Sequence, residues 1–463
     1  MSHSDQGLAP DATVVVVGAS LAGLRAAETL RREGHRGPLV MVGAEEDFNY
    51  DRPPLSKQFL AGTWGLDRIR LRPPDKIDAL GLDLRLGRRA AALDVDGRRV
   101  HLDDGATLEY DGLVIATGAH PRTLPGTEAS TAARTLRTLA DATALAGILD
   151  AAQAGLRDAA QAGASDAARA GVRDAAHAGV LDAAQAGASD AAQAGASDAA
   201  RAGALHVVVV GGGFIGAEVA ATCAGRGARV TLVEALPTPL GRVLGEAVGS
   251  VCVALHEDHG VEVLTATGVD AVTATPDGAA SVRLGSGSVL DADVVVVGIG
   301  VVPGTEWLER SALHIDNGVV TDAALFAADR VVAAGDVCRW AEPRLDGEHV
   351  RLEHWTNAAE QGVHAAHSLL AGRRHAQPFD TVPYFWSDQY DVKIQMLGHP
   401  RPDDDIVVVE GTGSLDDGRF VALYGRAGRL AAVLGFGRPR QLMGYRPLLV
   451  AGASFDQALA HRS

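Results

Sequence analysis

Two glycine-rich turns have the residue types and spacing of sites that bind the pyrophosphate of a dinucleotide. The first follows an expected strand, Thr13–Val17, and reads Gly18-Ala19-Ser20-Leu21-Ala22-Gly23 before an expected helix. The free backbone N–H groups and the positive dipole end of such a helix attract a pyrophosphate. Ser20 stands where the usual pattern has its second glycine. Because serine is small, we still expect the backbone to approach the ligand closely.

The second turn matches the pattern more fully. It reads Gly211-Gly212-Gly213-Phe214-Ile215-Gly216 after the expected strand His206–Val210, and the next expected strand ends at Glu234. A carboxylate at this point accepts from the adenosine 2′-hydroxyl and repels a 2′-phosphate. Since the two residues after Glu234 carry no positive charge, the sequence favours NADH over NADPH.

Further apolar strands that end in small residues follow each turn. Leu113-Val114-Ile115-Ala116-Thr117-Gly118 follows the first, and Val294-Val295-Val296-Val297-Gly298-Ile299-Gly300 follows the second. Val331–Ala334 leads into Gly335-Asp336, where an acid can bond a ribityl hydroxyl, and Glu45 is a candidate for bonding ribose hydroxyls. Two dinucleotide sites in one chain indicate a flavin and a nicotinamide, the pair needed to pass a hydride between two cofactors.

Three other segments have distinctive sequences: Tyr50-Asp51-Arg52-Pro53-Pro54-Leu55-Ser56-Lys57, Glu353-His354-Trp355-Thr356-Asn357 and Phe385-Trp386-Ser387-Asp388-Gln389-Tyr390. They resemble signatures of FAD-dependent ferredoxin reductases of the putidaredoxin reductase and biphenyl dioxygenase reductase type, within the glutathione-reductase-like flavoproteins. The resemblance implies an α/β fold with two Rossmann-like three-layer ββα nucleotide-binding domains and a C-terminal α+β domain.

The resemblance also implies that one FAD-binding domain is split around an NAD-binding domain. We expect FAD-binding parts at 1–120 and 301–378, the NAD-binding domain at 121–300, and a C-terminal reductase domain at 379–463. An insertion at 150–205 repeats Asp-Ala-Ala-x-Ala-Gly-x-x every eight residues. Because it has few bulky apolar residues, we interpret it as an exposed arm, either fraying helix or disordered.

Matching the signatures onto this chain implies roles for single residues. Lys57 would lie beside the flavin N5, and Glu218 would pair with it near the nicotinamide, so these two are the candidate catalytic residues. A surface lysine and a first-turn acid stabilised by the helix dipole remain the alternatives. Trp355 would meet the flavin through its backbone, and a helix from Thr356 would point at the flavin. The candidate cofactor-binding residues are Gly18, Ser20, Ala22, Gly23, Glu45, Arg52, Lys57, Ala90, Thr117, Gly118, Arg137, Gly211, Gly213, Phe214, Ile215, Gly216, Glu234, Gly300, Gly335, Asp336 and Trp355.

The cysteine pattern points to an external electron acceptor. Cys223, Cys252 and Cys338 are far apart in sequence, which excludes a CxxC pair and a linear metal or iron–sulfur motif, and we expect no bound metal. Disulfide reductases of this class carry two cysteines near the FAD helix, whereas Tyr50–Leu60 contains none. We therefore expect electrons to leave one at a time to an iron–sulfur protein. Arginine clusters at 68–72 and 437–440 are candidate docking sites.

These features predict an FAD-dependent NADH:ferredoxin oxidoreductase. A hydride passes from NADH to the flavin N5, and single electrons then go to a [2Fe-2S] ferredoxin that serves a mono- or dioxygenase. One alternative is an NADH-dependent reductase of rubredoxin, quinone or dioxygen. Another is a non-catalytic flavin-bound interaction or redox-sensing protein in which the repeat recruits a partner.

Composition narrows the partners and the compartment. The 463 residues suggest about three domains. Acidic residues outnumber basic ones by 58 to 42, for a net charge of −16, which argues against nucleic-acid binding. We expect no membrane span and no signal segment, so the protein is expected in the cytoplasm as a monomer or dimer.

Overall fold

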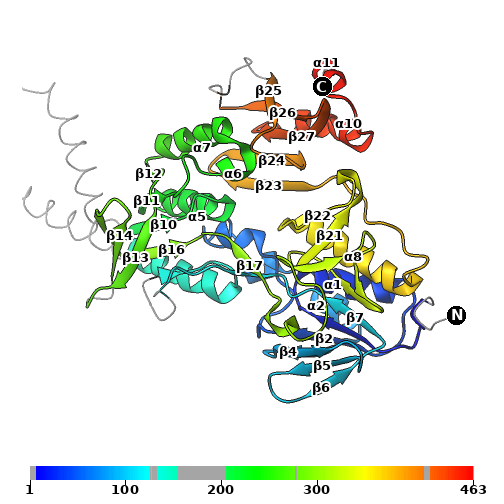
Figure 1. Cartoon of the computed structure of the whole chain (residues 1–463). Helices are drawn as coiled ribbons and strands as arrows, with labels where there is room; N and C mark the ends of the chain where they lie inside the picture. The colour runs from blue at the N-terminus through cyan, green and yellow to red at the C-terminus, as the bar shows by residue number, and fades with distance from the viewer. Residues whose placement is uncertain are drawn as a thin grey trace, which may run out of the picture.

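The chain folds into two α/β units and a C-terminal antiparallel sheet (Figure 1). This confirms the predicted fold class. The computed structural model describes residues 7–125, 127, 133–154, 205–276, 279–410, 415 and 418–461. Most of the predicted repeat arm therefore lies outside the described residues. The division into domains remains a prediction.

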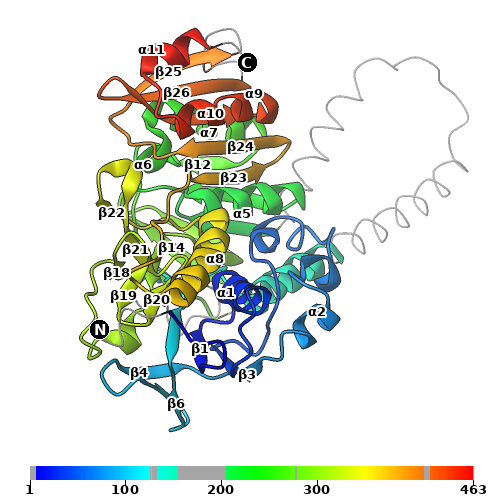
Figure 2. The same ribbon diagram turned by 90° about the vertical axis from the view of Figure 1, so that its right-hand side faces the viewer.

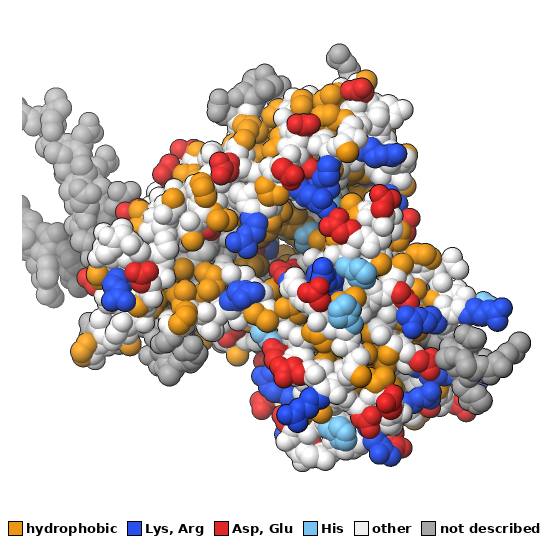
Figure 3. All heavy atoms as spheres, in the orientation of Figure 1, with side chains coloured by type: hydrophobic (Ala, Val, Ile, Leu, Met, Phe, Trp, Pro, Cys, Tyr) orange, Lys and Arg blue, Asp and Glu red, His pale blue; other side chains and the backbone are white. Residues whose placement is uncertain are grey.

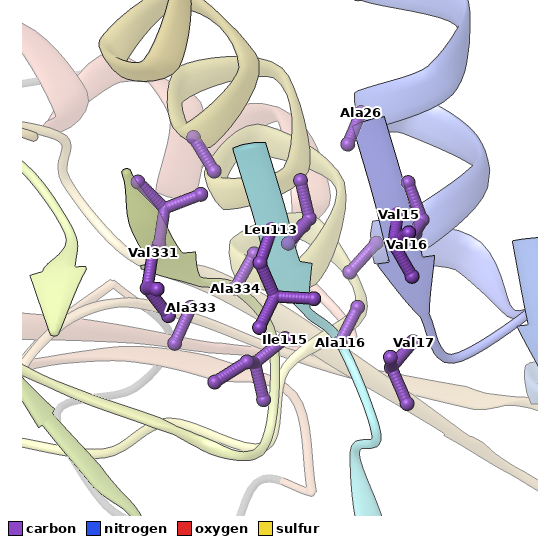
Figure 4. Packing of buried hydrophobic residues seen from close by; sticks show 14 of the residues in the cluster. Val15, Val16, Val17, Ala26, Leu113, Ile115, Ala116, Val331, Ala333 and Ala334 are labelled. Carbon is purple, nitrogen blue, oxygen red and sulfur yellow. The ribbon is translucent and has the colours of Figure 1, made fainter. Parts of the chain in front are cut away.

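The first α/β unit is built on a six-stranded sheet in the order β19-β20-β7-β1-β2-β3, parallel from β20 to β3. The run Val14–Val17 is buried throughout, as expected for a parallel strand covered on both faces. Figure 4 shows Val15, Val16 and Val17 beside Leu113 and Ile115 of the neighbouring strand, with Val331 on the far side of that strand. The strands are β1 (Val14–Val17), β2 (Leu39–Gly43), β3 (Asp83–Leu86), β7 (Gly112–Ile115), β19 (Phe326–Ala328) and β20 (Val331–Ala333).

The second α/β unit repeats this design with a five-stranded sheet in the order β12-β11-β10-β16-β9. Its pairs are also parallel, and the valine-rich centre is again fully buried. The strands are β9 (Ala133–Arg134), β10 (His206–Val210), β11 (Arg229–Val233), β12 (Glu262–Leu264) and β16 (Val294–Val297). A helix over residues 139–154 leads to the point where the described chain breaks before β10.

Smaller sheets complete each unit. Three-stranded sheets supply the extra β layer of the ββα design: β4 (Ala90–Asp94), β5 (Arg99–Leu102) and β6 (Thr107–Glu109) in the first unit; β13 (Val269–Ala274), β14 (Ala280–Leu284) and β15 (Val289–Ala292) in the second. The other small sheets pair β8 (Ala119–Pro121) with β17 (Val301–Pro303), and join β18 (Val319–Thr321), β21 (Cys338–Glu342) and β22 (Glu348–Val350).

The C-terminal sheet has the order β23-β24-β27-β26-β25 and packs on the second unit. Leu244 and Cys252 of that unit share a hydrophobic cluster with Phe385 and Ile394 of the sheet. The Tyr424 hydroxyl also donates to the Leu244 carbonyl at 2.9 Å. The strands are β23 (Tyr384–Gln389), β24 (Val392–Gly398), β25 (Asp405–Glu410), β26 (Phe420–Arg426) and β27 (Arg429–Phe436).

The helices pack against the sheets. Figure 2 shows α8 lying beside α1 on the first unit. The α-helices are α1 (Leu21–Arg32), α2 (Pro74–Asp78), α5 (Phe214–Gly225), α6 (Gly241–Leu244), α7 (Glu246–Asp258), α8 (Trp355–Ala371), α9 (Pro439–Gly444), α10 (Arg446–Val450) and α11 (Phe455–Ala460). Short 3₁₀ turns are η2 (Pro53–Ser56), η3 (Leu66–Ile69), η4 (Glu306–Leu308) and η5 (Pro343–Leu345). Among the described residues, no helix is long and apolar enough to cross a membrane.

The contact between α1 and α8 requires glycine at position 362. A Cβ on Gly362 would lie 2.3 Å from the Ala22 carbonyl oxygen, so the helices would have to move apart. We expect Gly362→Ala to lower the free energy of unfolding by about 1–3 kcal/mol, as overpacked cores do. Gly147, in the helix over 139–154, has nothing within 4 Å of such a Cβ. Gly147→Ala should therefore be neutral or stabilise by up to about 1 kcal/mol. Urea unfolding of both variants checks this, and equal stability would contradict it.

Candidate active site

A cavity of about 1220 Å³ lies where the parallel strands of both units end. The turns after β1 and β10 line it, together with the residues after β7 and β16 and the start of β23. Ligands of open α/β sheets bind at this carboxyl edge. The volume exceeds the range of about 300–1,000 Å³ that is usual for one small ligand. Figure 3 shows a hollow near the middle of the face that is turned to the viewer, with basic and acidic side chains around it.

The first turn forms a cradle that only glycine permits. Gly18 has φ +121°, and a Cβ there would lie 2.0 Å from the Ala116 carbonyl oxygen. Ser20 is the N-cap of α1, but its side chain makes no capping hydrogen bond, so the first N–H groups of the helix stay available to an anion. Gly23 differs from the prediction because it does not line the cavity. Its Cβ would lie 2.0 Å from the Gly18 carbonyl oxygen, so this glycine lets the helix pack on the turn.

The second turn forms a matching cradle at the start of α5. Gly211 has φ +101°, and a Cβ there would lie 2.4 Å from the Gly298 carbonyl oxygen. The N-cap, Gly213, again leaves the first N–H groups of the helix without a side-chain partner. Glu234 accepts from the Gly212 N–H at 2.6 Å and from the Leu236 N–H at 2.7 Å. This carboxylate is thus fixed at the edge of the cradle. The two cradles fit two dinucleotides.

A buried ion pair lies between the cradles. Lys57 follows η2, Glu218 is in the second turn of α5, and both line the cavity. Lys57 Nζ is 2.8 Å from Glu218 Oε2, and the side chains are only 9% and 3% exposed. Ser56 Oγ donates to the same carboxylate oxygen at 2.5 Å, and Ser387 Oγ donates to Glu218 Oε1 at 2.7 Å. The predicted pair is therefore formed in the structure.

Arg52 organises the side of the cavity near the first cradle. It donates to Glu45 at 2.5 Å and to the Arg137 carbonyl oxygen at 2.6 Å. The Tyr50 hydroxyl donates to Glu45 as well, and burial raises the pKa of Tyr50. Arg137 in turn pairs with Asp336 at 3.1 Å. The Glu45 carboxylate, expected to bond ribose, is thus engaged by Arg52 and Tyr50 in this structure.

Aromatic rings form another wall of the cavity. Trp355 donates from Nε1 to Asp51 Oδ1 at 2.7 Å, and its ring meets Trp386 edge-on at 6.0 Å. Helix α8 begins at Trp355, one residue before the expected Thr356, and His354 is its N-cap. The Thr356 hydroxyl donates to the Tyr384 carbonyl oxygen. Burial lowers the pKa of His354 to about 4, so this ring is neutral at pH 7.

The three cysteines take no part in this site. Cys223, Cys252 and Cys338 are buried and unpaired, and the residues that line the cavity do not include them. Burial raises the pKa of each thiol to about 12. Since the thiolate is the reactive form, these thiols are poorly suited to disulfide exchange.

The structure brings the predicted residues together, with Gly23 as the exception. Several residues that line or support the cavity had no role predicted from the sequence: Tyr50, Ser56, Trp307, His354, Ser387 and Gln389. All of them except Trp307 lie inside the three signature segments, so their position in these segments could have identified them. Trp307 had no such signal.

Comparison with known proteins agrees with the geometry. The pyridine nucleotide-disulphide oxidoreductase family matches residues 12–362, and the reductase C-terminal family matches 384–462. The chain is 36% identical to the anthranilate 1,2-dioxygenase system ferredoxin–NAD(+) reductase component of Burkholderia cepacia, over 96% of this chain and 95% of the relative. It is 31% identical to putidaredoxin reductase of Pseudomonas putida, over 92% and 89%.

A solved structure of the covalent putidaredoxin reductase–putidaredoxin complex superposes with a TM-score of 0.80 at 30% identity, over 97% of this chain and 96% of that one. The structure of Fdr9 superposes with a TM-score of 0.76 at 36% identity, over 96% of each chain. FAD and NAD(H) are the cofactors of this group, which agrees with the two cradles. The chain belongs to the ferredoxin reductases within the pyridine nucleotide-disulphide oxidoreductase family.

Proposed function

We propose that this oxidoreductase is an NADH:ferredoxin reductase whose electrons serve a mono- or dioxygenase. The observation that carries the proposal is the convergence of both dinucleotide cradles on the buried Lys57–Glu218 pair. In this geometry, a flavin held by the first cradle and a nicotinamide held by the second share one cavity. The roles of the single site residues belong to the proposal.

Each charged residue has a separate task in this reaction. Bound FAD supplies the exchange between a two-electron hydride and single electrons. Lys57 holds a positive charge at the cavity wall, where it favours negative charge on a reduced ring. Glu218 fixes the Lys57 ammonium, and Glu234 fixes the edge of the second cradle for the adenosine ribose. Arg52, Arg137 and Asp336 orient the first cofactor.

A ferredoxin is the acceptor that fits the remaining observations. Two relatives are named as reductases of a ferredoxin and of putidaredoxin. The buried cysteines leave the site without a thiol acceptor of its own. Of the candidate docking arginines, Arg72 is paired with Glu28, and Arg70 pairs with the exposed Asp67. Because Arg68 and Arg70 are exposed and Arg72 is half-buried, Arg68 and Arg70 are better placed for a partner. The buried, unpaired thiols also favour the reducing cytoplasm as the compartment.

Acceptor dependence tests the proposal. In anaerobic titration, NADH should bleach the flavin of the purified protein. Cytochrome c reduction by NADH should then depend strongly on an added [2Fe-2S] ferredoxin. Flavin bleaching without ferredoxin dependence would favour rubredoxin, quinone or dioxygen as acceptor. A flavin that NADH does not bleach would favour the non-catalytic alternative.

Lys57→Ala tests the role of the buried cation. We expect the substitution to slow NADH-driven flavin bleaching by about ten- to a hundredfold without abolishing it, because the cradles stay intact while the charge is lost. Stopped-flow absorbance measures the rate. Lys76→Ala is the matched control, since Lys76 is 70% exposed on α2. An unchanged rate in Lys57→Ala would refute the assigned role.

Glu234→Ala tests the preference for NADH. The substitution removes the acceptor for two backbone N–H groups and the group that repels a 2′-phosphate. We expect the NADH concentration for half-saturation to rise about tenfold and discrimination against NADPH to fall. Glu257→Ala, at an exposed position of α7, is the control. Half-saturation that stays the same for both nucleotides would contradict the assignment.

A further inference from the structure

The Glu218 carboxylate joins three parts of the chain that are far apart in sequence. Ser56 and Lys57 come from the first unit, Glu218 from the second, and Ser387 from the C-terminal sheet. Ser56 and Lys57 both donate to Oε2, so Ser387 is the donor that remains for Oε1. Ser387 is fully buried and Glu218 is 2% exposed. Water is thus a poor substitute for the serine hydroxyl.

Strand β23, which carries Ser387, packs directly against helix α5, which carries Glu218. Phe385, Ser387 and Gln389 are the buried alternate residues of β23, so they share one face of the strand. The Phe385 ring meets Phe214, the first residue of α5, with ring centroids 4.1 Å apart. This packing holds the serine in line with the carboxylate.

The hydrogen bonds around Ser387 have a fixed direction. A carboxylate only accepts, and a serine hydroxyl has a single proton to donate. Gln389 Nε2 donates to Ser387 Oγ at 3.3 Å. Since the amide N–H₂ can only donate, the Ser387 proton is left for Glu218 Oε1.

The residues around Gln389 support the same direction of the hydrogen bond from Gln389 to Ser387. The Tyr390 hydroxyl lies 2.8 Å from His256 Nδ1, and burial raises the pKa of Tyr390, so this hydroxyl keeps a proton to donate. Burial lowers the pKa of His256 to about 4, which leaves the ring neutral with one proton, on Nε2. Gln389 acts on this ring by raising its pKa, although His256 Nε2 and Gln389 Oε1 form no well-aligned bond. A proton on Nε2 favours the Gln389 oxygen facing His256 and the Gln389 nitrogen facing Ser387.

We propose that Ser387 is a positioning residue of the hydride-transfer site, which acts through Glu218 to hold the Lys57 ammonium. The C-terminal sheet then completes the active site as well as covering it. The inference rests on the NADH half of the proposed function and is independent of the acceptor. It predicts that Ser387 matters for the transfer step and has little effect on nucleotide binding.

Removing the hydroxyl tests this role. Ser387→Ala should slow anaerobic flavin bleaching by NADH about tenfold, as expected for one hydrogen bond to a charged group. The NADH concentration for half-saturation should stay unchanged. Ser387→Cys fills the space of the hydroxyl with a somewhat larger, weakly donating thiol and should slow bleaching in the same way, so an effect of the small cavity left by alanine would be recognised. Ser250→Ala, at an exposed position of α7, is the control and should be as fast as the unmodified protein.

A double-variant cycle with Glu218→Gln separates positioning from general damage. If Ser387 acts through Glu218, Ser387→Ala should cause no further slowing in the Glu218→Gln background. Urea unfolding of the purified protein gives a second readout that does not depend on turnover, and there too the double variant should lose less stability than the sum of the two single losses. The proposal would be overturned if the effects of the two substitutions on bleaching and on stability were independent of each other. It would also be overturned if Ser387→Ala bleached as fast as the unmodified protein. If cytochrome c reduction by the unmodified protein did not depend on ferredoxin, the proposed acceptor would be wrong. The role of Ser387 would not be affected by that outcome.

Discussion

The buried Glu218 carboxylate is the constraint on which the arrangement of the site depends. An ionised carboxylate taken out of water is strongly destabilising unless charge and hydrogen bonds compensate it. Here the compensation comes from Lys57, Ser56 and Ser387, and these donors belong to different parts of the chain. The two α/β units and the C-terminal sheet must therefore come together correctly before this charge is satisfied. The same contacts define where the two cofactor cradles face one another.

The cradles impose a second constraint, which is steric. Gly18 and Gly211 have positive φ, and the neighbouring carbonyl oxygens leave no room for a Cβ at either position. Both turns lie at the carboxyl ends of parallel strands, where helix N-termini present free N–H groups. Repeating one local design twice thus produces two anion-binding sites. The buried Lys57–Glu218 ion pair lines the cavity between them.

The sequence predicted the parts of the site that local chemistry encodes. Glycine spacing identified both cradles, and the family resemblance implied that Lys57 and Glu218 form a pair, although they are 161 positions apart. The role of Ser387 could not be read in the same way, because any buried serine in a strand looks alike until its partner is known. For Glu45 and Gly23 the sequence did not reveal the partners within the chain. Glu45 lines the cavity and binds Arg52, whereas Gly23 packs against the Gly18 carbonyl oxygen in the turn before its own helix.

The thiols explain why this frame supports electron transfer and not disulfide chemistry. Fold alone does not decide the reaction, because function depends on the groups placed at the site. In this chain the segment that precedes α2 contributes Ser56 and Lys57 to the cavity, where a disulfide reductase would have cysteines. The cysteines that exist are buried elsewhere, and the pKa of each thiol is raised to about 12. Electrons that enter as a hydride consequently have no covalent acceptor within the cavity. They must leave the cavity for an external acceptor, and the role proposed for the ion pair at Glu218 concerns only the entry of the hydride.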